Sequence, residues 1–243
     1  MIALLKKELG NFFSSLIGYI VIIVFLLTTA LLLWVFPVET NILNFGFAQI
    51  DGLFVIGPYV FLFLIPAITM KSFADENKSG TIEMLLTKPL SDLKIIMAKF
   101  LAAFILFLIA LLPTLIYYFT VYFLGLPVGN IDTAGTIGAY IGLLFLGAAF
   151  ISIGIFASSL TTNQIISFIF SLILSAFVFI GFDFIYDLDW FGNLNLLIKS
   201  LGINEHYHSI SRGVIDTRDI IYFVSLVVLF VILTRVSLQS RKW

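Results

Sequence analysis

Residues 71–99, KSFADENKSGTIEMLLTKPLSDLKIIMAK, form the only long polar run in the first two thirds of an otherwise apolar chain. The run contains five of the 13 Lys and Arg residues and four of the 14 Asp and Glu residues, whereas the flanking stretches contain almost none. This contrast predicts a water-facing connector between two membrane spans. Inside it, Gly80 and Pro89 favour the start and stop of a short helix. That helix would contain four apolar residues, Ile82, Met84, Leu85 and Leu86. A solvated loop has no need of them, so we interpret the segment as a docking element.

The composition places the whole chain in a membrane. Of its 243 residues, 61% are hydrophobic and only 11% are charged, whereas about a quarter of the residues of a soluble domain are charged. Cysteine is absent, which excludes disulfides and thiolate metal sites. The net charge of −1 and the lack of a basic block argue against nucleic acid as a partner. We therefore expect an all-α integral membrane protein.

The apolar stretches predict six transmembrane helices, because about 20 apolar residues cross a hydrocarbon core of about 30 Å. Residues 133–182 are uncharged and too long for one crossing, so they must fold back, and the polar cluster 158–164 is the place to turn. The prolines Pro58, Pro66 and Pro113 fall inside spans and are expected to kink them. The expected spans are 17–36, 53–70, 100–124, 135–157, 165–182 and 220–236.

The segments outside the spans differ in character. Residues 1–16 alternate apolar and polar side chains at helical spacing, which predicts an amphipathic helix in the membrane interface. The alternative is that they extend the first span into water. Residues 183–219 form a second polar connector with six acidic residues among aromatic ones. The sixth span has only 15 uncharged residues before Arg235 and is the least certain of the six.

The charge distribution predicts the orientation. Six spans place both termini on one side, together with the 71–99 connector. These segments hold ten of the 13 basic residues, so the positive-inside rule makes them cytoplasmic and the 183–219 connector extracytoplasmic. The expected location is the bacterial inner membrane, in contact with lipid.

The sequence contains little chemistry of its own. Apart from Arg235 near the end of the sixth, no charged residue falls inside an expected span, which argues against ion-coupled transporters and intramembrane proteases. No phosphate-binding Gly-x-x-x-x-Gly-Lys-Ser/Thr loop is present, so we expect no ATPase activity in this chain. His206 and His208 could form a metal pair, but with Glu205 as the only nearby third ligand we favour an ordinary exposed loop and expect no metal, catalytic or cofactor-binding residues.

Two function classes fit these observations. One is a permease driven by a separate ATPase, and the other is a non-transporting membrane anchor that recruits a cytoplasmic factor through the same loop. Each of Asp75, Glu76 and Glu83 could pair with a basic residue of a partner or belong to a solvated face.

The connector resembles that of a known family. Its pattern Phe73-x-x-Glu76-x-x-x-Gly80-Thr81-x-Glu83-x-Leu85-Leu86-x-x-Pro89, followed by a capped helix and the third span, is similar to type-2 ABC exporter permeases. The C-terminal stretch 210–223 and the ending Arg241-Lys242-Trp243 resemble the gliding-motility-associated members of that family. The resemblance covers the layout of the whole chain.

The resemblance implies a function for the pattern residues. They would form a short cytoplasmic coupling helix that sits in a cleft of an ABC ATPase subunit, where ATP and magnesium are bound. Gly80 would set a sharp turn, Thr81 and Glu83 would make polar contacts, and Leu85 and Leu86 would form an apolar plug. The family works with two permease halves, so a second copy or another membrane subunit with a periplasmic domain is implied, acting in gliding motility or associated export.

Overall fold

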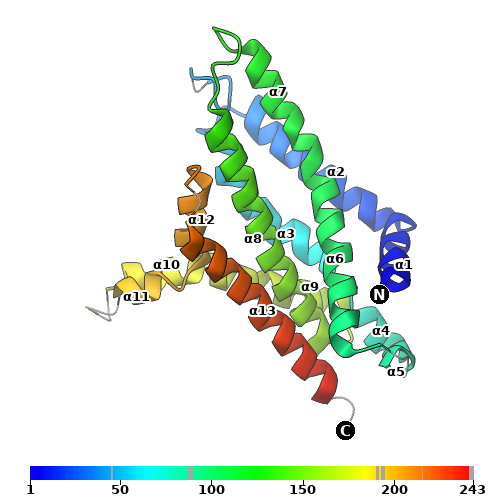
Figure 1. Ribbon diagram of the computed structural model, residues 1–243. Coiled ribbons are helices and arrows are strands. Elements are labelled where there is room, and N and C mark those ends of the chain that lie inside the picture. The colour runs from blue at the N-terminus through cyan, green and yellow to red at the C-terminus, as the bar shows by residue number, and fades with distance from the viewer. Residues whose placement is uncertain (45, 87–89, 190–191, 193–194, 215, 241–243) are drawn as a thin grey trace.

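The computed structural model describes residues 1–44, 46–86, 90–189, 192, 195–214 and 216–240. Within these residues the regular structure is entirely helical, and Figure 1 shows the helices as one bundle. Six helices are long and apolar enough to cross a membrane, which confirms the expected fold class. They span Leu16–Val35, Asp51–Ser79, Asp92–Leu124, Thr133–Leu160, Gln164–Asp187 and Thr217–Ser240.

Several of these helices change type along their length. The first comprises α2 (Leu16–Ala30) and a π-helical turn, and the second comprises α3 (Asp51–Thr69) and α4 (Ala74–Ser79). The third comprises α6 (Asp92–Leu111) and α7 (Leu115–Leu124), separated by a 3-10 turn at Pro113, where the ring removes a backbone donor. By contrast, α3 continues as one α-helix through both Pro58 and Pro66.

Helix α8 (Thr133–Leu160) is the centre of the bundle. Its buried residues run from Thr136 to Ser159, and α3, α6, α9 (Gln164–Ala176) and α13 (Thr217–Ser240) pack against it. An apolar helix buried on most sides is typical of the core of a membrane bundle. The outer helices α2, α9 and α13 present large apolar side chains, such as Ile23, Ile169 and Val228, at the surface, as a lipid-facing or subunit-facing helix does.

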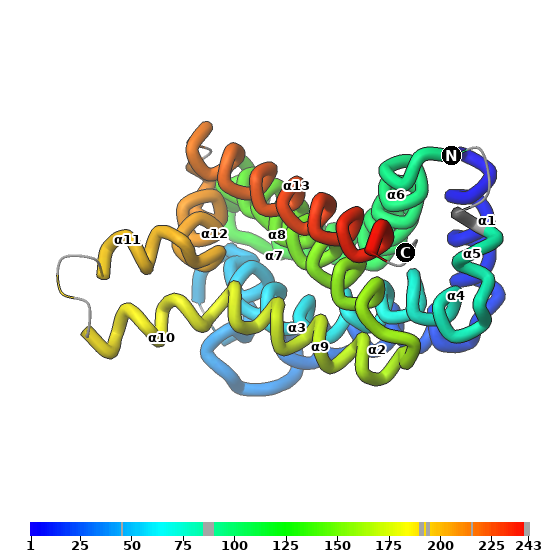
Figure 2. The backbone as a smooth tube through the Cα atoms, turned by 90° about the horizontal axis from the view of Figure 1, so that it is seen from below, coloured from blue at the N-terminus to red at the C-terminus, as the bar shows by residue number. Residues whose placement is uncertain are grey.

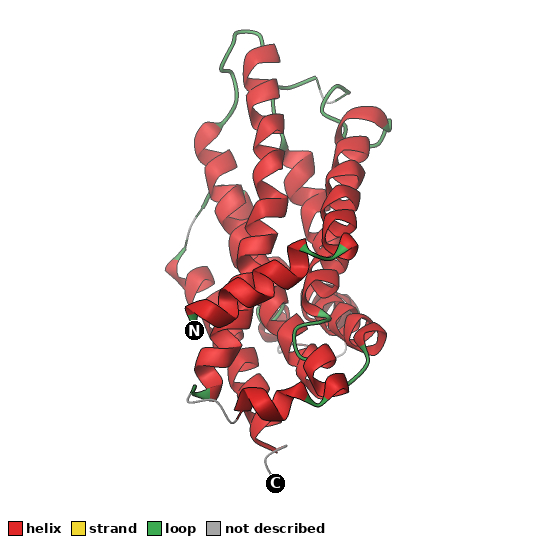
Figure 3. Cartoon of the chain, turned by 90° about the vertical axis from the view of Figure 1, so that its right-hand side faces the viewer, coloured by secondary structure: helices red, strands yellow, loops and turns green. Residues whose placement is uncertain are grey.

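The N-terminal residues form a separate helix, α1 (Ile2–Phe13), rather than an extension of the first span. The chain turns sharply at Ser14 and Ser15, which brings Phe12 so close to Gly18 that a Cβ at Gly18 would lie 2.6 Å from the Phe12 carbonyl oxygen. Helix α1 therefore lies across the bundle rather than along it (Figure 3).

The second connector differs from the expected loop. After a π-helical turn (Phe177–Gly181), the chain forms α10 (Phe182–Asp187), α11 (Asn195–Lys199) and α12 (Ile203–Ser211), and α10 and α11 project sideways from the bundle (Figure 2). Helix α12 packs against α8 and α13, and its residues Ile203, Tyr207 and Ile210 are buried. The prediction of an exposed loop around Tyr207 is therefore wrong, because the apolar residues of this segment repeat at helical spacing and face the bundle.

The two ends of the bundle carry different segments. Helices α4 and α5 (Thr81–Leu86) and the last turns of α13 lie at one end, and the turn between α7 and α8 lies at the other (Figure 1). Helix α5, the part of the 71–99 connector that resembles a coupling helix, thus lies at the same end of the bundle as the last turns of α13.

Candidate functional site

The candidate site begins at the bend between α3 and α4, residues 70–73, which we call the elbow. The Oγ atom of Ser158, a fully buried residue of α8, accepts hydrogen bonds from the backbone N–H groups of Phe73 (2.9 Å) and Ala74 (3.0 Å). The same hydroxyl donates to the carbonyl oxygen of Met70 at 3.1 Å. The end of one helix and the start of the next leave such backbone groups without helical partners. One side chain of the central helix therefore satisfies both helix ends at the elbow.

Two further side chains attach α4 to neighbouring helices. The Nδ2 group of Asn77 donates to the carbonyl oxygens of Ser159 (3.4 Å) and Thr161 (3.0 Å) at the end of α8. The carboxylate of Asp75 accepts a hydrogen bond from the side chain of Gln164 at the start of α9. Helix α4 is consequently fixed to the turn between α8 and α9.

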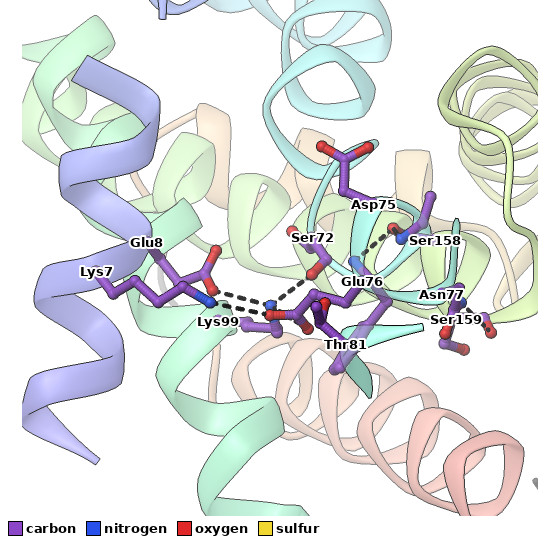
Figure 4. A network of polar contacts seen from close by, with 12 residues as sticks. Lys7, Glu8, Ser72, Asp75, Glu76, Asn77, Thr81, Lys99, Ser158 and Ser159 are labelled. Carbon is purple, nitrogen blue, oxygen red and sulfur yellow. Dashed lines mark hydrogen bonds and ion pairs between the residues drawn. The ribbon is translucent and has the colours of Figure 1, made fainter. Parts of the chain in front are cut away.

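A buried charge cluster joins α4 to α1 and α6 (Figure 4). Its central residue is Lys99 of α6, whose side chain is 1% exposed. The Lys99 Nζ atom lies 2.9 Å from Glu8 Oε1 and 3.0 Å from Glu76 Oε2, and it donates to the carbonyl oxygen of Ser72. It also lies 4.9 Å from the centroid of the Phe73 ring, within the range of a cation–π contact.

The outer edge of this cluster is open. Lys7 of α1 is half-exposed and approaches Glu76 Oε1 at 3.4 Å, so Glu76 has a cation on each oxygen. A cavity of about 290 Å³ lies beside the cluster, between α1, α3, α4 and α6. Within the part of the chain that the structure describes, two carboxylates and two ammonium groups balance here. A buried charge is stable only when it is paired in this way.

The cluster makes one mechanical unit of segments that are far apart in the sequence. Glu8 belongs to α1, Glu76 to α4 and Lys99 to α6. Because leaving any one of these charges unpaired in a buried site costs about 3–5 kcal/mol, α4 cannot move away from α1 and α6 without a loss of that size.

Gly80 separates α4 from α5. Its φ of +70° lies in the left-handed region, which a residue with a Cβ adopts only with strain, and among the described residues no neighbouring atom lies within 4 Å of the position of that Cβ. Ser79 Oγ and Thr81 Oγ1, 2.8 Å apart, bridge the turn from both sides. The sharp turn expected at Gly80 is thus present.

Helix α5 presents a mixed surface. Thr81, Glu83 and Met84 are exposed, Met84 by 69%, whereas Ile82 is buried within the chain. Leu85 and Leu86 belong to α5, but the structure describes only their backbone, and Pro89 lies outside the described residues. Of the four apolar residues interpreted as a docking surface, Ile82 is therefore part of the fold.

The structure divides the predicted site residues into two groups. Phe73 and Glu76 are buried and contact Lys99, while Thr81 and Glu83 lie beyond Gly80 on the exposed helix. Glu76 is neither on a solvated face nor free to pair with a partner, since both of its oxygens face lysines of this chain.

Sequence reasoning missed Lys99 and Ser158. Lys99 looked like one more cytoplasmic charge at the end of the connector. The signal was its setting, because Ile95, Ile96, Ala98 and Phe100 around it follow the pattern of a buried helix. Ser158 looked like part of a polar turn. Its partners are backbone groups of the elbow, more than 80 positions earlier in the chain, and only the tertiary structure brings them together.

The comparisons with known proteins concern the chain as a whole. A family model described as ABC-2 family transporter protein matches residues 2–241, nearly the whole chain. A search of curated proteins finds no match. With six apolar helices of membrane-spanning length and a family match from the first helix to the last, this chain belongs to the ABC-2 family of transporter proteins.

Proposed function

We propose that this chain, as the permease subunit of an ABC transporter, is driven by ATP hydrolysis in a separate ATPase subunit that docks on α5. The observation that carries the proposal is the construction of the α4–α5 unit. Its inner half is attached to α1, α6, α8 and α9 by the contacts of Lys99, Ser158, Asn77 and Gln164. Its outer half, α5, is exposed beyond a glycine turn.

This construction suits the transmission of force. Closure of an ATPase can move membrane helices only through a rigid element that contacts both. A docking helix on a flexible loop would move without displacing the bundle. Here a displacement of α5 reaches α4, which the charge cluster connects to α1 and α6 and which Ser158 connects to α8. ATP and magnesium would be bound by the partner, and the permease contributes only the docking surface and the moving helices.

The finer parts of the proposal rest on the sequence. The positive-inside bias supports a cytoplasmic location for α5 and both termini in a bacterial inner membrane. The resemblance of the C-terminal stretch supports a role in gliding motility or associated export, with a second permease copy or another membrane subunit that has a periplasmic domain. The exposed apolar faces of α2, α9 and α13 would contact that subunit or lipid.

The test compares a substitution on α5 with one at the opposite end of the bundle. Tagged wild type, Leu85→Asp and Val128→Asp are purified from native membranes in mild detergent, and co-purified proteins are identified by mass spectrometry. Val128 is 61% exposed in the turn between α7 and α8, so its variant controls for the added charge. ATPase activity is then measured on each eluate.

We expect an ABC ATPase with the wild type and with Val128→Asp, and at least about a tenfold loss with Leu85→Asp, since a buried charge at an apolar contact costs more than 1.4 kcal/mol. Equal recovery with all three proteins would contradict docking on α5. Capture of a protein without a phosphate-binding loop, independent of nucleotide, would favour the membrane anchor instead.

A further inference from the structure

The opposite part of the molecule contains a second polar network, centred on α12. Tyr207 of α12 is 2% exposed, and its hydroxyl donates a 2.6 Å hydrogen bond to the carbonyl oxygen of Phe54 in α3. In an α-helix that carbonyl would accept from the N–H group four residues later, but this residue is Pro58, which has none. Tyr207 therefore supplies the bond that the proline removes.

The phenol is suited to this role at any working pH. Burial raises the pKa of the Tyr207 hydroxyl far above its ordinary value, so it remains protonated and able to donate. We call the Phe54 carbonyl, which Pro58 leaves without a helical donor, the proline gap of α3. Since an unpaired carbonyl inside an apolar bundle is costly, α12 and the proline gap stabilise each other.

The residue before Tyr207 fixes the other side of α12. His206 Nδ1 lies 2.7 Å from Asp219 Oδ1 at the start of α13, and His206 Nε2 lies 2.9 Å from the carbonyl oxygen of Ser200. The ring also stacks on Tyr222, with centroids 3.9 Å apart. Asp219 is 6% exposed, whereas the His206 side chain is 17% exposed and forms the open edge of the pair.

This geometry requires a proton beyond those of a neutral imidazole and a carboxylate. A carbonyl oxygen only accepts, so Nε2 must bear a hydrogen. Nδ1 faces a carboxylate oxygen, so a hydrogen must lie between these two atoms as well, on the ring or on the carboxyl. A neutral ring beside an ionised Asp219 has one hydrogen for two acceptors, and one contact becomes repulsive.

The other charged groups nearby are engaged elsewhere or exposed. Glu205 pairs with Lys199 of α11 at 3.0 Å, and Asp183 of α10 accepts from Asn204 at 2.6 Å. On α13 the neighbouring Arg218 is exposed, and the Tyr222 hydroxyl donates to the carbonyl oxygen of Leu201. Helix α8 has no charged residue, and α3 contributes Asp51 and Tyr59. Asp219 is thus the only carboxylate bonded to His206 in the described part of the chain.

We infer that His206 and Asp219 form a proton-binding site, here termed the latch, that holds α12 against the bundle. Loss of the proton would then break the hydrogen bond from the Tyr207 hydroxyl to the Phe54 carbonyl in α3. The latch would make the position of α12 depend on pH on its own side of the membrane. Because α3 leads directly into α4, it would also give the far side of the molecule a connection to the α4–α5 unit. The inference itself requires no ATPase partner.

The test uses the natural absence of cysteine. A single cysteine is introduced at the buried position Ile210→Cys or at the exposed position His208→Cys of the same helix, and each purified protein reacts with a water-soluble thiol reagent. The ratio of the two rates cancels the pH dependence of the thiol. We expect this ratio to rise by about fivefold or more when the pH is raised from about 5 to about 8.

Two substitutions separate the proton from a merely structural role. With Asp219→Asn, a neutral His206 donates from Nε2 to Ser200 and accepts at Nδ1 from the new amide, so every contact is satisfied without an extra proton. We expect slow labelling at both pH values. With His206→Gln we expect fast labelling of the cysteine at position 210 at both pH values. A pH-independent ratio in the wild type, or an unchanged pH response in Asp219→Asn, would overturn the inference.

A double-mutant cycle tests the connection to α3 with the same readout. Tyr207→Phe removes only the hydroxyl and should raise labelling at position 210 about fivefold. In a Pro58→Ala background the new N–H group at position 58 can donate to the Phe54 carbonyl within α3. Tyr207→Phe should then change the labelling rate at position 210 only slightly. Equal effects in both backgrounds would show that Tyr207 does not fill the proline gap.

Discussion

At the scale of single residues, the burial of Lys99 carries the most information. A lysine is rarely buried unless it is paired, and here the ammonium group has two carboxylates and a carbonyl oxygen around it. Two of the five acids in the connector and α1, Glu8 and Glu76, thus neutralise cations of the same chain. This residue converts three separate helices into one unit.

Removal of that charge should destabilise the fold. In Lys99→Met the aliphatic volume is kept, but Glu8 and Glu76 lose their shared buried cation, which costs about 3–5 kcal/mol. Thermal unfolding in detergent should show a lower Tm, whereas the exposed Lys6→Met serves as a neutral control. Adding Glu8→Gln and Glu76→Gln should restore part of the loss, because no buried charge is then left unpaired and Lys7 is half-exposed. An unchanged Tm in the single variant would mean that the cluster is not a constraint.

At the scale of elements, the elbow between α3 and α4 depends on a side chain from a third helix. Helix α4 has only six residues, and a helix so short is not stable by itself. Ser158 accepts from the backbone N–H groups at the start of α4, the side chain of Asn77 donates to the end of α8, and Gly80 provides the left-handed turn that ends α4. The rigidity of the α4–α5 unit is therefore a property of its contacts with α8.

Ser158→Ala should loosen this elbow specifically. Two buried N–H groups and one partly buried carbonyl lose their partner, each buried group at about 1–3 kcal/mol, so amide exchange across residues 73–79 should accelerate by at least about tenfold. Ser152→Ala is a matched control, since Ser152 is equally buried in α8 but bonds to the Ala149 carbonyl of its own helix. Equal protection in the two variants would exclude Ser158 as the anchor of α4.

At the scale of the whole molecule, the bundle separates a basic end from an end that contains the turn between α7 and α8. The proposal places the basic end in the cytoplasm. Helix α5 and the last turns of α13 would then face the ATPase, and α12 would face the opposite compartment with its latch.

The orientation can be measured because the chain contains no cysteine. Glu83→Cys on α5 and Val128→Cys in the opposite turn are both exposed positions. In spheroplasts, a membrane-impermeant maleimide should label position 128 and not position 83, and permeabilisation should make position 83 reactive. Labelling of position 83 in intact spheroplasts would reverse the proposed topology.

The sequence by itself determined the class of the protein and the number of its membrane helices, because uncharged stretches of about 20 residues have no stable alternative outside a bilayer. It also determined a helix between Gly80 and Pro89, of which Thr81–Leu86 is described. Only the tertiary structure decided what the polar residues do. Lys99, Glu76, His206 and Asp219 have partners 13 to 91 positions away in the chain. Local periodicity contains no information about such pairs, since they form only when the packing of the helices brings them together.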